Sequence, residues 1–94
     1  MNWKRIYVFK HDKNHVLGTR TLLVSSINSN RRFLCDEDWV IVRRYAAAMR
    51  RGARFPMIDV GWLDGHLKAF DGNHRLEACR SLGIKRIPVV MIRS

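Results

Sequence analysis

The sequence has little proline, little cysteine and no long apolar stretch. Two prolines among 94 residues and a hydrophobic fraction of 47% argue against a disordered chain. No apolar run approaches the roughly 20 residues that a membrane-spanning helix requires, and residues 1–5 lack the apolar block of a signal peptide. We therefore expect residues 1–94 to form one cytoplasmic domain that does not enter a membrane.

The cysteines and histidines show no spacing that is typical of a metal site. Cys35 and Cys79 lie too far apart for a CxxC motif, and two cysteines cannot staple a secreted scaffold. His11 and His15 are four residues apart, which would suit a helix, but residues 12–14 between them have the composition of a turn. We therefore predict that the chain builds no metal site of its own.

Acidic residues are also scarce. Asp and Glu number 8 against 18 Lys and Arg, which leaves a formal net charge of +10. Thirteen of the basic residues are arginine, whose planar guanidinium matches the geometry of a phosphate group. The excess is largest in residues 1–35, which hold seven basic side chains and one acidic side chain. The composition therefore predicts a partner that carries phosphate groups.

Strand-forming residues dominate two segments of the first third of the chain, residues 4–9 and residues 20–27. The polar stretch between them, residues 10–18, is predicted to be a loop or a long hairpin connection. An exposed loop that contains Arg31 and Arg32 follows the second strand.

Residues 36–51 form the clearest predicted helix. Residues 36–38 are all acidic, so their side chains can cap free amides and complement the positive end of the helix dipole. Arg50 and Arg51 suit the last turn, and Gly52 can adopt the left-handed conformation that ends a helix. The apolar stripe is expected at four positions with helical spacing: Trp39, Val42, Ala46 and Met49.

The second half of the chain alternates strands, turns and one short helix. A strand is predicted over residues 55–63, with Trp62 on its inward face, and Asp64 and Gly65 then give the strongest turn signal in the chain. The remaining predicted elements are a return strand over residues 66–70, a helix to about Leu82, and a last strand over residues 87–92. This order predicts a small, single-domain α+β fold with a mixed sheet and two main helices.

One short segment carries the residues that suggest chemistry: Asp71, Gly72, Asn73, His74 and Arg75. It joins a predicted strand directly to the start of a helix, whose first amides are unpaired and partly positive and so can bind an anion. Gly72 allows the backbone to approach a ligand closely, and His74 and Arg75 add charged donors. We therefore predict phosphate binding here, with Glu77 or Asp71 assisting a divalent ion and Glu77 as the candidate catalytic acid.

A simpler alternative exists for the same segment. Asp71 or Asn73 would only cap the helix, and Gly72 would only make the turn. Spacing alone favours this alternative, because the motif is much less specific than a Walker loop.

Residues 55–93 resemble the shared part of the ParB/sulfiredoxin superfamily. The sequence reads FPMIDVGWLDGHLKAFDGNHRLEACRSLGIKRIPVVMI. Members of the superfamily combine an extended strand pair, a motif of the type Gly-x-x-Arg or Asp-Gly-x-His-Arg, a helix that ends in Leu-Gly, and a closing Ile-Pro-Val strand. The resemblance implies the fold of that superfamily, and it leaves residues 1–19 unassigned.

The resemblance also implies a nucleotide site. In sulfiredoxin the motif is Gly-Gly-Cys-His-Arg, where the cysteine attacks a sulfinic acid and the His-Arg pair contacts ATP phosphates. Asn73 takes the place of that cysteine, so sulfinic reductase activity is not expected. His74 and Arg75 match the His-Arg pair, so the resemblance implies nucleotide binding at these residues.

Other branches of the superfamily match less completely. ParB binds CTP through a Gly-Glu-Arg-Arg segment, but the glutamate is absent here and no helix-turn-helix follows in the 94 residues. Free serine kinases carry Asp-Gly-x-His-Arg, and the acids available for such a reaction here are Glu77 and residues 36–38. Some small relatives from plasmids or phages have been assigned nuclease or nucleotide-hydrolysing activity, and the size and charge of this chain suit such an origin.

The remaining basic residues suggest a second surface. Arg31 and Arg32 are expected near a phosphate ligand or in a solvated loop. A further set on or just after the predicted helix can contact phosphate groups of nucleic acid: Arg43, Arg44, Arg50, Arg51 and Arg54. Such contacts follow the backbone and read no sequence. Trp39 and Trp62 are expected in the core, and Trp3 at the surface.

The sequence therefore favours a ParB/sulfiredoxin-like domain that binds an ATP- or CTP-type nucleotide with Mg²⁺ and acts with nucleic acid, with NTP hydrolysis or nuclease chemistry as an extension. The first alternative is a non-enzymatic basic module that binds DNA or an acidic host protein. The second is a phosphotransferase similar to the free serine kinases.

Overall fold

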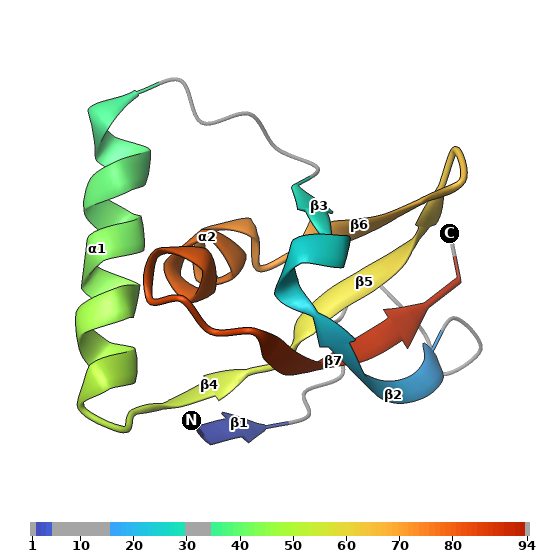
Figure 1. Ribbon diagram of the computed structural model, residues 1–94, viewed down its shortest axis with the longest axis horizontal. Coiled ribbons are helices and arrows are strands. Elements are labelled where there is room, and N and C mark those ends of the chain that lie inside the picture. Colours follow the sequence, from blue (N-terminus) through green and yellow to red (C-terminus); the bar gives the residue numbers. More distant parts are fainter. Residues whose placement is uncertain (1, 5–15, 30–34, 94) are drawn as a thin grey trace.

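The computed structural model describes residues 2–4, 16–29 and 35–93, and they form an α+β fold (Figure 1). The helices are α1 (Asp36–Arg50) and α2 (Asn73–Ser81), and a 3-10 turn, η2, covers Val24–Ser26. The strands are β1 (Asn2–Lys4), β2 (Val16–Leu23), β3 (Asn28–Ser29), β4 (Arg54–Pro56), β5 (Ile58–Leu63), β6 (His66–Asp71) and β7 (Arg86–Ile92).

The main sheet is mixed, as predicted. Its five strands lie in the order β2-β7-β5-β6-β3. The β2/β7 and β5/β6 pairs are antiparallel, whereas β5/β7 and β3/β6 are parallel. A separate parallel pair joins β1 to β4. The carboxyl end of β6, where the predicted phosphate motif begins, therefore lies between β5 and the short edge strand β3.

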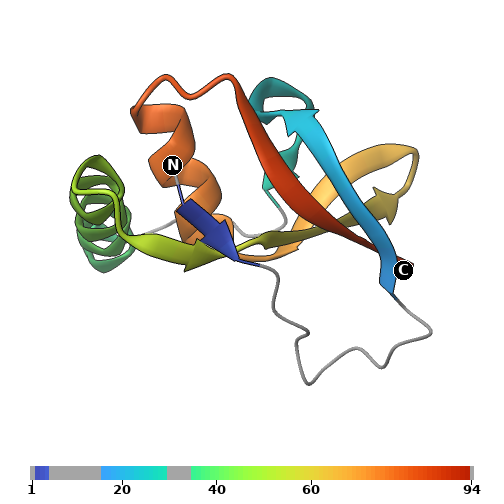
Figure 2. The same ribbon diagram turned by 90° about the horizontal axis from the view of Figure 1, so that it is seen from below.

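The two helices pack in succession against this sheet. Figures 1 and 2 show α2 between α1 and the strands. The largest fully buried side chains come from both layers and include Ile27, Ile58, Leu76, Ile87 and Val89. Neither helix in the described part of the chain is long and apolar enough to span a membrane.

The apolar stripe of α1 differs from the prediction at one position. Val42, Ala46 and Met49 are buried as expected, but Trp39 is 42% exposed. The stripe continues instead through Asp38, one turn before Val42, which is only 6% exposed. The prediction for Trp39 was wrong because it passed over a polar residue at the position that faces α2.

The other two tryptophans also differ from the predictions. Trp62 is 54% exposed, because it lies near the end of the β5–β6 hairpin, which extends away from the helices (Figure 1). Trp3 is half-buried and packs against the core, with its ring centroid 6.1 Å from that of Phe55.

Two predicted strands have different limits in the structure. The strand predicted over residues 20–27 begins at Val16 and ends at Leu23, because the Val24 amide donates to the Lys85 carbonyl (2.8 Å) and the chain turns. The strand predicted over residues 55–63 is divided at Met57, whose amide donates to the Lys4 carbonyl (2.8 Å). Residues 5–9 of the first predicted strand, and residues 10–15 of the loop after it, lie outside the described residues.

The hairpin turn and both helices are confirmed. Asp64 and Gly65 have positive φ values of 53° and 78°, as a two-residue hairpin turn requires. The helix predicted over residues 36–51 is α1, which ends one residue earlier, with Arg51 as its C-cap. The acidic first turn of α1 is present, but no side chain caps the helix at Cys35, its N-cap residue.

The two cysteines should differ sharply in reactivity. Burial raises the pKa of the Cys79 thiol to about 11, and the nearby Arg75 charge offsets part of this effect. Cys35 is exposed. We expect iodoacetamide to modify Cys35 in the native protein and both thiols in denaturant, as mass spectrometry would show, since the thiolate is the reactive form. Rapid native modification of Cys79 would contradict this packing.

Candidate functional site

The predicted phosphate motif lies at the junction of β6 and α2. β6 ends at Asp71, Gly72 is the N-cap residue with a φ of 89°, and α2 begins at Asn73. The first helical hydrogen bond runs from the Leu76 amide to the Gly72 carbonyl (2.9 Å). The chain thus passes from strand to helix within one residue, and the first amides of α2 point back toward the end of the sheet.

The N-cap residue of α2 is Gly72, which has no side chain to cap the helix start. The Asn73 amide group is engaged elsewhere: its oxygen accepts a hydrogen bond from Ser29 Oγ (2.9 Å), and its nitrogen donates to the Ala69 carbonyl (3.2 Å). Asp71 makes an ion pair with Arg75. These contacts differ from the side-chain cap on which the simpler alternative depended.

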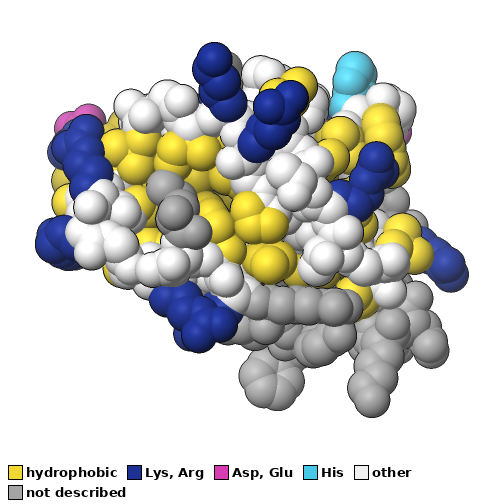
Figure 3. Space-filling model, turned by 60° about the horizontal axis from the view of Figure 1, so that its bottom comes forward, with side chains coloured by type: hydrophobic (Ala, Val, Ile, Leu, Met, Phe, Trp, Pro, Cys, Tyr) yellow, Lys and Arg dark blue, Asp and Glu magenta, His cyan; other side chains and the backbone are white. Residues whose placement is uncertain are grey.

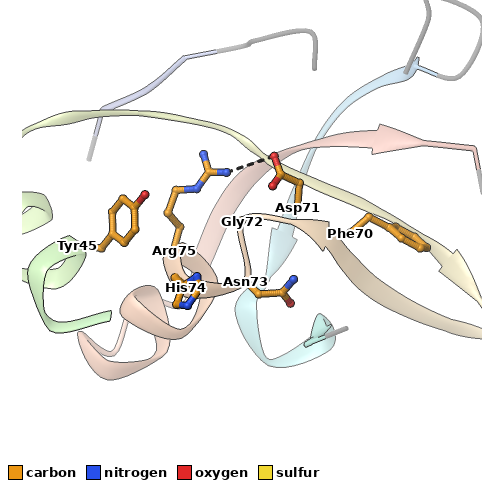
Figure 4. A pocket seen from close by; sticks show the side chains of 7 residues that line it. All are labelled: Tyr45, Phe70, Asp71, Gly72, Asn73, His74 and Arg75. Carbon is orange, nitrogen blue, oxygen red and sulfur yellow. Dashed lines mark ion pairs between the residues drawn. The ribbon is translucent and has the colours of Figure 1, made fainter. Parts of the chain in front are cut away.

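Arg75 is buried beside this helix start. Its Nη1 donates to the Pro56 carbonyl (2.6 Å), and its Nη2 lies 3.6 Å from Asp71 Oδ2 (Figure 4). The side chain of Arg75 is only 10% exposed. A guanidinium has five N–H donors, more than these two contacts use. Arg75 is therefore a fixed cation whose further donors can serve a ligand.

A pocket of about 360 Å³ opens at this junction (Figure 4). This volume lies within the range of small-molecule sites, about 300–1,000 Å³. The residues that line it are Tyr45, Phe70, Asp71, Gly72, Asn73, His74 and Arg75. All five residues of the predicted phosphate motif are thus brought to one pocket.

The ring of His74 contacts a residue of α1, Asp38. Its Nε2 lies 2.8 Å from Asp38 Oδ1, although the two residues are 36 positions apart in the sequence. Cys35 Sγ donates to the other carboxylate oxygen of Asp38 (3.4 Å). The contact fastens the first turn of α1 to the first turn of α2.

Glu77 has a different position from the one predicted. It does not line the pocket, and its carboxylate forms an ion pair with Arg80 on the same helix. Arg80 also donates to the Ile27 carbonyl. These contacts join α2 to the turn before β3. Asp71 is therefore the acidic residue that lines the pocket, whereas Glu77 is paired with Arg80.

The predicted basic surface is exposed. Arg43, Arg44 and Arg50 lie on α1, and Arg51 and Arg54 follow it, all with exposed side chains. On the face drawn in Figure 3, Lys and Arg side chains are spaced around an apolar area and do not gather in one patch. Arg31 and Arg32 lie outside the described residues.

Sequence reasoning missed Tyr45 and Phe70, and it did not predict that Asp38 contacts His74. Tyr45 lies three residues after Val42 on α1, and its ring meets that of Phe55 edge-on at 5.6 Å. Tyr45 also lines a second groove, of about 340 Å³, with Ile41, Arg44, Ala48 and Phe55. One signal was available in the sequence, since Tyr45 has the spacing of the buried stripe and a polar end.

Within residues 2–4, 16–29 and 35–93, no three His, Cys, Asp or Glu side chains gather closely enough to hold a metal ion.

Comparison with protein-family profiles and with curated protein sequences gives no significant match. Comparison with solved structures gives 22 significant matches. Sulfiredoxin from Arabidopsis thaliana is 25% identical, with a TM-score of 0.66, over 81% of this chain and 85% of the sulfiredoxin chain. This chain has the ParB/sulfiredoxin-like superfamily fold.

Two further neighbours of this fold have nucleotides bound. ParB from Caulobacter crescentus, in complex with CTP-gamma-S, has a TM-score of 0.59 and 21% identity over 79% of this chain. A free serine kinase variant in complex with ADP has a TM-score of 0.63 and 16% identity over 95% of this chain. The ParB/sulfiredoxin-like domain described here spans 43% of that ParB chain and 36% of that kinase chain.

Gly72 should tolerate no side chain. A Cβ at this position would lie 2.8 Å from Arg75 Nη2 and 3.0 Å from Ile58 Cγ1. We expect Gly72→Ala to lower the free energy of unfolding by about 1–2 kcal/mol through its positive φ and by about 1–3 kcal/mol more through this overlap. Urea denaturation measures both effects.

Gly65→Ala is the matched control for this variant. Gly65 has a φ of 78°, but nothing lies within 4 Å of its added Cβ. It should therefore show only the backbone effect. Equal losses in the two variants would mean that Arg75 is not held against Gly72.

Proposed function

We propose that this ParB/sulfiredoxin-like domain binds a nucleotide, with its phosphate groups at the start of α2. The observation that carries the proposal is a helix start, with glycine as its N-cap residue, that opens into a pocket beside the buried cation of Arg75. Backbone amides and a fixed guanidinium are the donors that phosphate oxygens accept most readily. The nucleotide complexes of ParB and the free serine kinase support the same ligand class.

The second groove suits the nucleoside. It shares Tyr45 with the phosphate pocket and adds Ile41, Ala48 and Phe55 as apolar or aromatic surface. A nucleobase binds well to such surface because its faces are apolar and polarisable. Arg44 also lines the groove and brings one charged donor to its edge. The ligand would thus extend from the start of α2 along the face of α1 that carries Ile41, Arg44 and Ala48.

A magnesium ion would arrive with a triphosphate. Asp71 is the pocket carboxylate that can contact it, because its side chain is 41% exposed and Glu77 is paired with Arg80. Mg²⁺ commonly binds one or two carboxylates together with substrate phosphates. Phosphate release is the reaction to assay after binding.

Calorimetric titration with ATP, CTP and ADP, with Mg²⁺ and about physiological salt, tests the proposal. We expect micromolar affinity for at least one of them. Arg75→Lys keeps the charge but removes the guanidinium fork, so it should weaken binding at least tenfold. Arg75→Ala is less informative, because it also leaves the Pro56 carbonyl without this donor and should destabilise the fold.

Arg86→Lys is the control, since it makes the same exchange at an exposed residue of β7. It should bind as the wild type does. The absence of any heat with all three nucleotides, at protein concentrations that would detect micromolar binding, would contradict the proposal. Equal affinities for Arg75→Lys and wild type would mean that the nucleotide does not bind at the start of α2.

A second function is favoured by one observation. Five arginines along α1 and the start of β4 are exposed, and four of them lie outside both pockets near α1. We propose that this surface contacts the phosphate backbone of nucleic acid, without base readout. The nucleotide pocket would then act beside a polyanion-binding surface.

Salt dependence tests this second function. Each arginine that contacts duplex phosphate contributes about 0.9 to the slope of log K against log salt concentration. We expect the triple variant Arg50→Gln, Arg51→Gln and Arg54→Gln to lower that slope by about 2–3 for duplex DNA, measured by fluorescence anisotropy. Its nucleotide affinity should not change. A slope equal to that of the wild type would contradict the proposed surface.

A further inference from the structure

Asp38 is buried in a way that its sequence position does not suggest. It lies in the first turn of α1, where an acidic side chain commonly faces solvent. Here it is 6% exposed, and the other buried charged residues in the described part of the chain are Asp59 and Arg75. Burial of a carboxylate is unfavourable unless hydrogen bonds compensate it. The contacts of Asp38 must therefore compensate the cost of its burial.

The contacts of Asp38 lead to the nucleotide pocket. Oδ1 lies 2.8 Å from His74 Nε2, and Oδ2 accepts a hydrogen bond from Cys35 Sγ (3.4 Å). His74 in turn lines the pocket at the start of α2. One carboxylate oxygen is thus directed at a pocket side chain, and the other is fixed to its own helix.

This arrangement determines which nitrogen of His74 carries a hydrogen. An ionised carboxylate only accepts hydrogen bonds, so Nε2 must be the donor toward Asp38. The other nitrogen, Nδ1, can donate to a phosphate oxygen only when it also carries a hydrogen, as it does in the imidazolium form. The carboxylate also fixes the plane of the imidazole, because the contact joins two buried or partly buried groups.

We propose that Asp38 is the positioning residue of the nucleotide pocket, which holds His74 through Nε2 and favours the imidazolium form, whose Nδ1–H donates to the phosphate groups. The inference rests on the proposed function and adds to it a residue from α1 that does not line the pocket itself. It is a positioning role, because Asp38 acts on the ligand through His74.

The direction of the expected change in phosphate affinity distinguishes this positioning role from a purely electrostatic effect of Asp38. Asp38 carries a negative charge near a site for anions, so removal of that charge alone would strengthen phosphate binding. Loss of the contact between Asp38 and His74 would weaken phosphate binding. Asp38→Asn removes the charge but keeps the size of the side chain. An uncharged amide no longer favours the imidazolium, and because it can also donate, it allows a neutral His74 whose Nε2 carries no hydrogen.

The test compares Asp38→Asn with Asp36→Asn, which removes the same charge from an exposed residue of the same helix turn. Calorimetry with the nucleotide that binds the wild-type protein best should show about tenfold weaker binding for Asp38→Asn, the typical effect of losing one charge-assisted hydrogen bond. Asp36→Asn should bind as tightly as the wild type or slightly more tightly. Unchanged or tighter binding by Asp38→Asn would overturn the proposal.

A double-mutant cycle with His74→Gln tests whether Asp38 acts on the ligand through His74. If Asp38 acts through His74, Asp38→Asn should have no further effect on affinity in the His74→Gln background. An undiminished effect in that background would show that Asp38 does not act through His74, and would overturn the proposed role.

Long-range ¹H–¹⁵N spectra of the histidine rings supply a readout that needs no ligand. The spectrum of His74, assigned by its loss in His74→Gln, should show Nε2 protonated in the wild type and in Asp36→Asn. Asp38→Asn should populate a form with Nε2 unprotonated. An unprotonated Nε2 in the wild type would overturn the proposal without any variant, even if Asp38→Asn failed to fold.

The two measurements also separate this inference from the proposed function. If the wild-type protein binds none of the nucleotides, the proposed function fails and the positioning role fails with it, whatever the spectra show. If the nucleotide binds and Arg75→Lys weakens it while Asp38→Asn does not, the function stands and the positioning role alone fails.

Discussion

The site depends on the contact between the buried guanidinium of Arg75 and the ends of two strands. Arg75 donates to the Pro56 carbonyl at the end of β4 and pairs with Asp71 at the end of β6. Its Nη2 also occupies the space into which a side chain at Gly72 would project. One cation thus fixes the turn, the direction of α2 and the place where its first amides emerge. A buried charge is stable only with such partners, so the same contacts that hold the fold also hold the donor in the pocket.

The polar residues around α2 divide into those that fasten the helix and those that face the pocket. Asn73 links α2 to Ser29 and Ala69, and Arg80 links it to the Ile27 carbonyl. The sequence resemblance places Asn73 where sulfiredoxin has its cysteine, and here that position joins β3 and β6 to the helix. The position of α2 therefore does not depend on a side-chain cap at Gly72, because contacts at both ends of the helix hold it in place.

Local signals in the sequence predicted much of the fold. The helix over residues 36–51 and the Asp64-Gly65 turn follow from spacing and φ requirements, which a short window contains. The order of the strands and the burial of Asp38 do not, because they depend on contacts between distant segments. The apolar pattern placed Trp39 in the core, whereas His74, 36 positions after Asp38, makes a buried carboxylate favourable there. The division of the strand at Met57 depends likewise on Lys4, which no local pattern includes.

Among the described residues, the net charge of +10 is not concentrated at the pocket. Asp71 pairs with Arg75 there, and Asp38 contacts His74, so acidic and basic groups accompany one another around the start of α2. The proposed phosphate binding would therefore rest on directed amide and guanidinium donors in a partly enclosed space, which salt screens weakly. The exposed arginines on and after α1 would act on a polyanion through general attraction, which salt screens strongly. The two proposed functions thus use different physical interactions, and the overall charge of the chain bears mainly on the second.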